Sequence, residues 1–192
     1  RTLALRGYAE YGITDAWTVT ASESFERIEM EGYNRLDRTS GLGDLTLALK
    51  RRLPAGPLVA SAEASLKLPT GYAIDRAPAL GTGAADLGAR IAVGGARGRL
   101  YATAEAGYVA RAGWHADLAP CALEAGWSAA RDLLVRGELR GAATVGHASA
   151  PLALFDPALA DSRYLGGSLA IVLRGRPFDT VVGLDRVLSG RN

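Results

Sequence analysis

Hydrophobic and polar residues alternate along most of the chain, and the alternation is clearest over residues 44–68. One side of this segment carries Leu45, Leu47, Leu49, Ala60, Ala62, Ala64, Leu66 and Leu68, and the charged residues fall on the other side. A period of two predicts β-strands with unlike faces. Because the turn residues Pro54-Ala55-Gly56-Pro57 divide the segment, the pattern predicts an antiparallel hairpin.

Four other segments show the same alternation on both sides of a short turn. They are 2–26, 84–110, 119–140 and 162–188, and with 42–69 they predict ten strands joined in simple up-and-down order. The predicted strands are about 11 residues long, against a typical five or six. Residues 27–40, 70–83, 111–117 and 143–161 lack the period and are predicted to be loops.

Short turns therefore alternate with long connections, which is typical of a transmembrane β-barrel with short periplasmic turns and longer outer loops. A tilted strand crosses a bilayer in about 9–11 residues, which matches the predicted lengths. Aromatic residues near the strand ends fit the interfacial girdles of such barrels: Tyr11, Trp17, Tyr108, Trp127, Tyr164 and Phe178. We predict an all-β, transmembrane, up-and-down antiparallel barrel that forms a single domain over residues 1–192.

The topology also predicts strands outside this sequence. With the short turns in the periplasm, both Arg1 and Asn192 would lie on the outer side, whereas barrels with an even number of strands start and finish in the periplasm. One further strand at each end would correct both termini and close the barrel at about 12 strands.

Composition narrows the function. The net charge is only +2 and no basic run is dense, which argues against a nucleic-acid partner. No apolar run approaches the ~18 residues of a transmembrane helix. The same alternation would also suit a soluble ligand-binding barrel with its apolar face inside. Strand length, the asymmetry of the connections and an apolar face rich in Ala and Gly favour the membrane.

Several short motifs occur in order along nearly the whole chain. They are Tyr11-Gly12-Ile13-Thr14-Asp15, Gly41-Leu42-Gly43-Asp44-Leu45, Lys67-Leu68-Pro69-Thr70-Gly71-Tyr72, Leu80-Gly81-Thr82-Gly83 with Asp86, and Ser189-Gly190-Arg191-Asn192. In these motifs the sequence resembles a family of bacterial outer-membrane transporters that is loosely associated with meta-pathway phenol degradation. The resemblance implies a 12-stranded barrel in a Gram-negative outer membrane, and it likewise implies a strand before Arg1 and one after Asn192.

No motif predicts catalysis. The Gly81-Thr82-Gly83 segment lacks the helix and the Lys-Ser/Thr pair of a phosphate loop, so it is interpreted as a loop re-entering a strand. His115 and His147 lie in predicted outer loops, and His147 near Ser149 has no identifiable orienting acid. Cys121 is the single cysteine and falls on the predicted lipid-facing side. We expect no enzyme activity, no metal and no cofactor.

The polar face carries nearly balanced charges that would line the lumen. They are Arg6, Glu10, Asp44, Lys50, Glu63, Lys67, Asp86, Arg90, Glu105, Glu124, Arg136, Glu138 and Arg140. One interpretation is a narrow polar path for small, including aromatic or hydrophobic, molecules, since wide aqueous channels need about 16–18 strands. The other is a lattice of ion pairs that seals a structural barrel, which would partner another envelope protein. In both cases the expected surroundings are outer-membrane lipids.

Overall fold

The computed structural model describes residues 2–31, 36–54, 56–72, 80–81, 83–113, 115–146, 163–175 and 179–191. These residues form eleven strands: β1 (Thr2–Gly12), β2 (Trp17–Glu31), β3 (Leu36–Leu42), β4 (Leu45–Leu53), β5 (Val59–Leu68), β6 (Asp86–Arg97), β7 (Leu100–Arg111), β8 (Asp117–Ala130), β9 (Leu133–Val145), β10 (Arg163–Leu173) and β11 (Thr180–Arg191). No described helix is long and apolar enough to cross a membrane.

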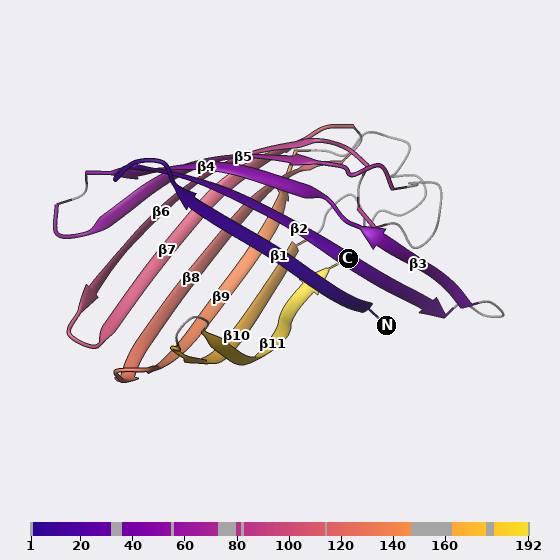
Figure 1. Ribbon diagram of the computed structural model, residues 1–192. Helices are drawn as coiled ribbons and strands as arrows, with labels where there is room; N and C mark the ends of the chain where they lie inside the picture. The colour runs from indigo at the N-terminus through magenta and orange to yellow at the C-terminus, as the bar shows by residue number, and fades with distance from the viewer. Residues whose placement is uncertain are drawn as a thin grey trace.

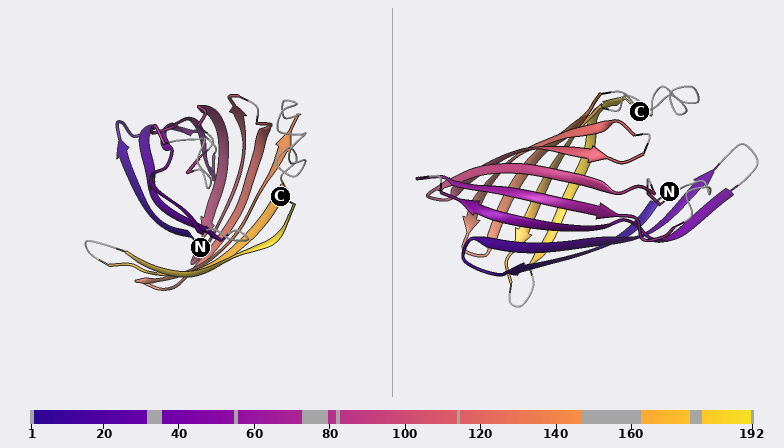
Figure 2. Two further views of the ribbon diagram at one scale, coloured as in Figure 1. Left: turned by 90° about the vertical axis from the view of Figure 1, so that its right-hand side faces the viewer. Right: turned by 90° about the horizontal axis from the view of Figure 1, so that it is seen from above.

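All strands belong to one antiparallel sheet that curls around a common axis (Figures 1 and 2). The path β1-β2-β4-β5-β6-β7-β8-β9-β10-β11 joins neighbours in sequence order, which confirms the predicted up-and-down path of ten strands. Within the described residues β1 and β11 are the edge strands of an open sheet. Closure by further strands remains a prediction.

The loop predicted over residues 27–40 is wrong in part. Strand β2 continues to Glu31 and β3 begins at Leu36, so the two pair from Phe25–Leu42 to Glu31–Leu36 and form an extension beyond the remaining sheet (Figure 2). The extension has charged residues on both faces, Arg27 and Glu29 on one and Glu26 and Asp37 on the other, and therefore shows no clear apolar alternation. A break at residues 43–44 separates β3 from β4, and the Gly43 amide bonds the Ser24 carbonyl there (2.7 Å).

The two faces of the sheet differ sharply in burial. The buried side chains on its strands, including Thr20, Ala48, Asp86, Leu134 and Val172, all lie on the polar face, which is the concave one. Large apolar side chains lie on the other face and are exposed: Leu5 by 74%, Ile91 by 63% and Leu123 by 59%. An apolar exterior around a polar interior is the arrangement of a membrane barrel. It is the reverse of the soluble ligand-binding barrel.

The connections define two ends of the barrel. At the turn end, short turns join β1–β2, β4–β5, β6–β7, β8–β9 and β10–β11; at the loop end lie the β2–β3 extension and the connections after β5, β7 and β9 (Figure 1). The predicted asymmetry of turns and loops holds only in part: the connections after β5 and β9 are long, but the β7–β8 connection, residues 112–116, is shorter than the β10–β11 turn, residues 174–179. The predicted loop 143–161 begins later than expected, since β9 continues to Val145.

Candidate functional site

The strand register gathers the predicted lumen residues on the inner face. Residues Lys50, Glu63 and Arg90 are direct neighbours on β4, β5 and β6, and Glu124 lies opposite Glu138 on β8 and β9. Eleven of the thirteen predicted residues form ion pairs: Asp44, Lys50, Glu63, Lys67, Asp86, Arg90, Glu105, Glu124, Arg136, Glu138 and Arg140. The other two, Arg6 and Glu10, lie on the same face of β1, where Glu10 accepts a hydrogen bond from Tyr8 (2.6 Å).

These pairs form two kinds of environment. In the middle of the wall, Arg90 lies 3.2 Å from Glu105 and Arg136 lies 3.3 Å from Glu124, yet the two arginine side chains remain 45% and 40% exposed. At the loop end, the side chains of Lys67, Arg111 and Asp86 are only 22%, 15% and 8% exposed. The inner wall is thus open to solvent along its middle and packed at one end.

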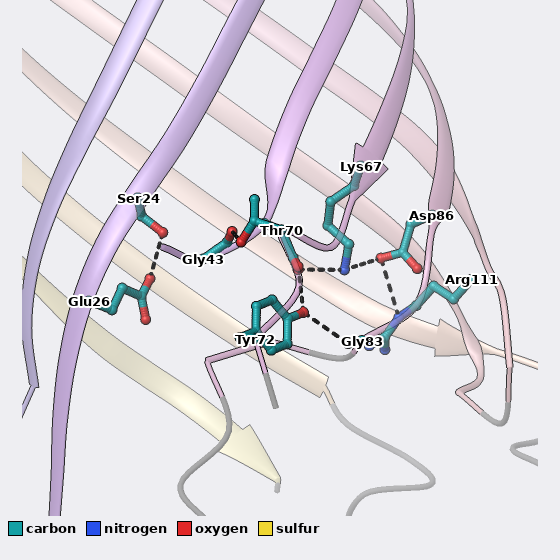
Figure 3. A network of polar contacts seen from close by, with 10 residues as sticks. Ser24, Glu26, Gly43, Lys67, Thr70, Tyr72, Gly83, Asp86 and Arg111 are labelled. Atoms are coloured by element: carbon teal, nitrogen blue, oxygen red, sulfur yellow. Dashed lines mark hydrogen bonds and ion pairs between the residues drawn. The ribbon is translucent and has the colours of Figure 1, made fainter. Parts of the chain in front are cut away.

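We call Asp44, Lys67, Tyr72, Asp86 and Arg111 the mouth cluster, and Figure 3 labels the last four of them. The Lys67 ammonium lies between two carboxylates, 3.1 Å from Asp44 and 2.5 Å from Asp86, and Arg111 Nε lies 3.9 Å from Asp86. Asp86 Oδ1 and Arg111 Nε are buried with no hydrogen-bond partner among the described atoms. The cluster joins β4, β5, β6 and β7 at their loop ends.

Tyr72 ties the connection after β5 to this cluster. Its hydroxyl donates to Asp44 Oδ1 (2.5 Å) and accepts a hydrogen bond from the Gly83 amide (2.9 Å) (Figure 3). Burial, and then the hydrogen bond to Asp44, raise the pKa of Tyr72 to about 12, so the phenol is neutral at physiological pH. The Thr70 hydroxyl adds a bond to the Gly43 carbonyl (2.7 Å).

Gly81 permits the close approach of Tyr72. A Cβ atom at position 81 would stand 2.2 Å from the Tyr72 hydroxyl oxygen and 2.9 Å from Asp44 Oδ1. Gly81 and Gly83 of the predicted re-entering loop therefore have a structural role, because Gly81 lies against the phenol and the Gly83 amide donates to it.

A second tyrosine organises the exposed part of the wall. The Tyr101 hydroxyl donates to Glu124 Oε1 (2.7 Å), and the other oxygen of Glu124 lies 3.3 Å from Arg136. Farther round the wall, Arg140 pairs with Glu138 at 3.7 Å and with Asp185. These contacts form two groups, one from Tyr101 on β7 to Arg136 on β9 and one from Glu138 on β9 to Asp185 on β11.

His115 lies at the loop end between β7 and β8 and is partly buried. Burial, and then the nearby Arg111 guanidinium, lower the pKa of His115 below its ordinary value of 6.5. Residues His147 and Ser149, the other candidates for chemistry, lie outside the described residues. Cys121 is exposed on the apolar outer face, as expected from the alternation.

Sequence reasoning missed three members of these networks as site residues. Arg111 was assigned to a loop, although β7 reaches it and pairs it with Asp86. Tyr72 sits in a connection with no periodic signal, and Tyr101 lies on the correct face but carries no charge. The alternation that places Thr103 and Glu105 inside also places Tyr101 inside, so that signal was present for Tyr101.

A curled antiparallel sheet with an apolar exterior and a charged, paired interior defines a β-barrel of the outer-membrane type. The structure is similar to the crystal structure of an outer membrane channel from Pseudomonas putida F1, with a TM-score of 0.75 and 17% sequence identity, over 98% of this chain and 76% of that chain. At this identity the similarity establishes the fold. No protein-family model and no characterised protein matches the sequence.

Proposed function

We propose that the protein is a β-barrel channel of the bacterial outer membrane that admits small molecules passively. The observation that carries this proposal is the solvent exposure of paired charges on the inner face. The side chains of Arg90, Arg136 and Arg140 are 45%, 40% and 42% exposed although each lies within an ion pair. Charged groups that keep this much water make a polar path along the middle of the barrel. The similarity to an outer membrane channel supports both the location and the class of function.

The solute class follows from the size and charge of the wall. About 12 strands enclose a narrower path than the ~16–18 strands of a wide porin. Because acidic and basic groups alternate around the wall, we expect weak ion selectivity. Small molecules, including aromatic or hydrophobic ones, are the proposed solutes.

A structural barrel that partners another envelope protein is the second candidate, and the mouth cluster favours it. Lys67 and Arg111 are packed where solute would enter, and the carboxylates of Asp44 and Asp86 balance their charges. Such a cluster could seal the barrel as readily as it could narrow it.

Single-channel conductance in planar bilayers separates the two. The full-length protein is compared with Arg90→Gln and Glu105→Gln, which remove opposite charges from one inner pair (3.2 Å). A channel shows discrete steps whose size or ion preference changes in opposite directions in the two variants. Arg27→Gln, on the β2–β3 extension, is the matched control and leaves the steps unchanged. Heat-modifiable gel mobility verifies folding, and folded but silent protein would contradict the conducting polar path.

A further inference from the structure

The arginines at the turn end differ from the cations of the inner wall. Arg51, Arg52, Arg97, Arg99, Arg131 and Arg174 lie in or next to the short turns, and all are exposed. Among the described residues, none of them lies within ion-pair distance of a carboxylate. Among the described inner-wall cations, Lys50, Lys67, Arg90, Arg136 and Arg140 have such partners and Arg6 does not. The turn-end cations therefore have charge that the described part of the chain leaves unneutralised.

Four of these arginines belong to the outer rim: Arg51 and Arg97 by strand alternation, and Arg99 and Arg131 in the turns. The guanidinium of Arg51 lies 5.3 Å from the ring centroid of Trp17, a cation–π distance. Arg97 is opposite Leu100, which is opposite Trp127 on the next strand. Each indole thus has an arginine in the same line of directly opposite residues across neighbouring strands: Arg51 for Trp17 and Arg97 for Trp127. We call Arg51, Arg97, Arg99 and Arg131 the arginine rim.

The arginine rim borders the apolar exterior directly. Leu100 is 61% exposed, Trp127 49% and Leu173 52%, all on the outward face near the turns. Tryptophan favours positions where one side is apolar and the other is wet, and arginine extends its charged head from an apolar surface toward water. Leucine, tryptophan and arginine thus lie side by side at the turn end of the outward face, a composition that suits the boundary between acyl chains and headgroups.

We propose that the arginine rim binds the phosphate groups of anionic phospholipids in the periplasmic leaflet of the outer membrane. This inference rests on the proposed outer-membrane location. Short turns mark the periplasmic end of such barrels, which selects phospholipid over the lipids of the outer leaflet. The planar guanidinium donates paired hydrogen bonds that match phosphate oxygens. The carboxylates in the same turns are Asp15, Asp132 and Asp179, and Asp179 already accepts a hydrogen bond from the Gly175 amide (3.1 Å).

Tryptophan fluorescence provides a local test. With Trp114→Phe as background, Trp17 and Trp127 are the remaining indoles of this sequence, and both lie at the rim. The protein is folded into phosphatidylcholine vesicles that contain either phosphatidylglycerol or phosphatidylcholine with a quencher near the headgroup. We expect stronger quenching by phosphatidylglycerol. The lipid preference, which is the association constant for phosphatidylglycerol divided by that for phosphatidylcholine, should be about fivefold for each arginine engaged at low salt. The ratio falls as ionic strength rises.

Removing all four rim charges should bring the ratio of association with phosphatidylglycerol to that with phosphatidylcholine close to one. The variant is Arg51→Gln/Arg97→Gln/Arg99→Gln/Arg131→Gln. Arg27→Gln/Arg38→Gln, on the β2–β3 extension, is the control and should retain the preference. Should the fourfold variant fail to fold, Arg51→Gln read by Trp17 alone and Arg97→Gln read by Trp127 alone give the same test. Equal quenching by the two lipids in the unmodified rim, or a preference that survives its removal, overturns the inference. Protein that fails to show heat-modifiable folding in vesicles counts instead against the membrane barrel itself.

Discussion

The ring of Tyr101 lies against the backbone of Gly126, its direct partner across the β7–β8 ladder. A Cβ atom at position 126 would stand 2.0 Å from Tyr101 Cε1, so only glycine allows the ring to lie there. The ring covers the glycine and reaches Glu124, two residues earlier on the same strand and face (2.7 Å). A single missing side chain thus positions an aromatic ring and, through it, one carboxylate of the inner wall.

Gly126→Ala should therefore displace Tyr101 and break its bond to Glu124. Forcing one methyl group into an occupied site costs about 1–3 kcal/mol of the free energy of unfolding. Equilibrium unfolding in urea from lipid vesicles measures this loss. Gly137→Ala is the matched control, because a Cβ atom there meets only the Ser168 carbonyl at 3.8 Å. That variant should be neutral or slightly more stable, and an equal loss in both variants would contradict the role of Tyr101.

Lys67→Met tests the mouth cluster. The change leaves the buried Asp86 without the ammonium 2.5 Å away, and Asp86 Oδ1 already has no described hydrogen-bond partner. Removing one member of a buried ion pair costs about 3 kcal/mol of the free energy of unfolding. Lys50→Met is the control, since its ammonium lies 3.9 Å from Glu63 and is 38% exposed. Such a pair contributes less than about 1 kcal/mol, so similar losses in the two variants would be inconsistent with a packed mouth.

His115 should make the loop end sensitive to acid. Its pKa is lowered by burial and by Arg111, so the folded protein binds its proton less readily than the unfolded chain does. The neutral histidine therefore contributes stability that is present above pH ~6.5 and is lost as pH falls below that value. Protonation would add a cation beside Arg111 and Lys67, with Asp86 as the opposing charge.

Thermal unfolding between pH 7.5 and pH 5 measures this effect. In a His147→Gln background, His115 is the single histidine of the sequence. The thermal unfolding midpoint should then fall less between pH 7.5 and pH 5 in His115→Gln than in the background protein. An unchanged slope in His115→Gln would show that other groups, such as the carboxylates of the inner wall, account for the acid sensitivity.

The inner face was predictable because the backbone itself alternates. Once Leu45, Leu47 and Leu49 are assigned to the lipid side, Lys50 must point inward, and the same argument on β5 and β6 places Glu63 and Arg90 beside it. No knowledge of the loops is needed for this result. All thirteen predicted positions fall on one face of the sheet, and that they line a lumen remains a prediction.

Other features depended on information that a period of two does not carry. The β2–β3 extension has charged residues on both faces, the Arg27–Glu29–Arg38 group on one and Glu26 and Asp37 on the other, so it lacks the contrast that marked the other strands. Arg111 lies where β7 ends, and strand ends are set by tertiary contacts such as its pairing with Asp86. Tyr72 reaches the wall through the conformation of a connection, which local sequence patterns leave open.

Tyr72→Phe asks whether the contact between the connection after β5 and the wall controls passage through the mouth. The variant keeps the ring but loses the donor to Asp44 and the acceptor for the Gly83 amide, while Lys67 still pairs with Asp44. A hydrogen bond to a charged group contributes about 1.5–3 kcal/mol. If the connection after β5 narrows the mouth while Tyr72 bonds Asp44, loss of that bond should make the connection detach from the wall at least about tenfold more often.

Single-channel recording of Tyr72→Phe should show this as more frequent transitions to a larger conductance, with the step of the attached state unchanged. Tyr8→Phe is the control, since it removes a hydroxyl that bonds Glu10 on β1, away from the mouth cluster (2.6 Å). Identical recordings for wild type and Tyr72→Phe would mean that the narrowest part of the path lies elsewhere on the wall. In that case Arg136 and Arg140 would be substituted alongside Arg90, because the side chains of all three retain contact with solvent.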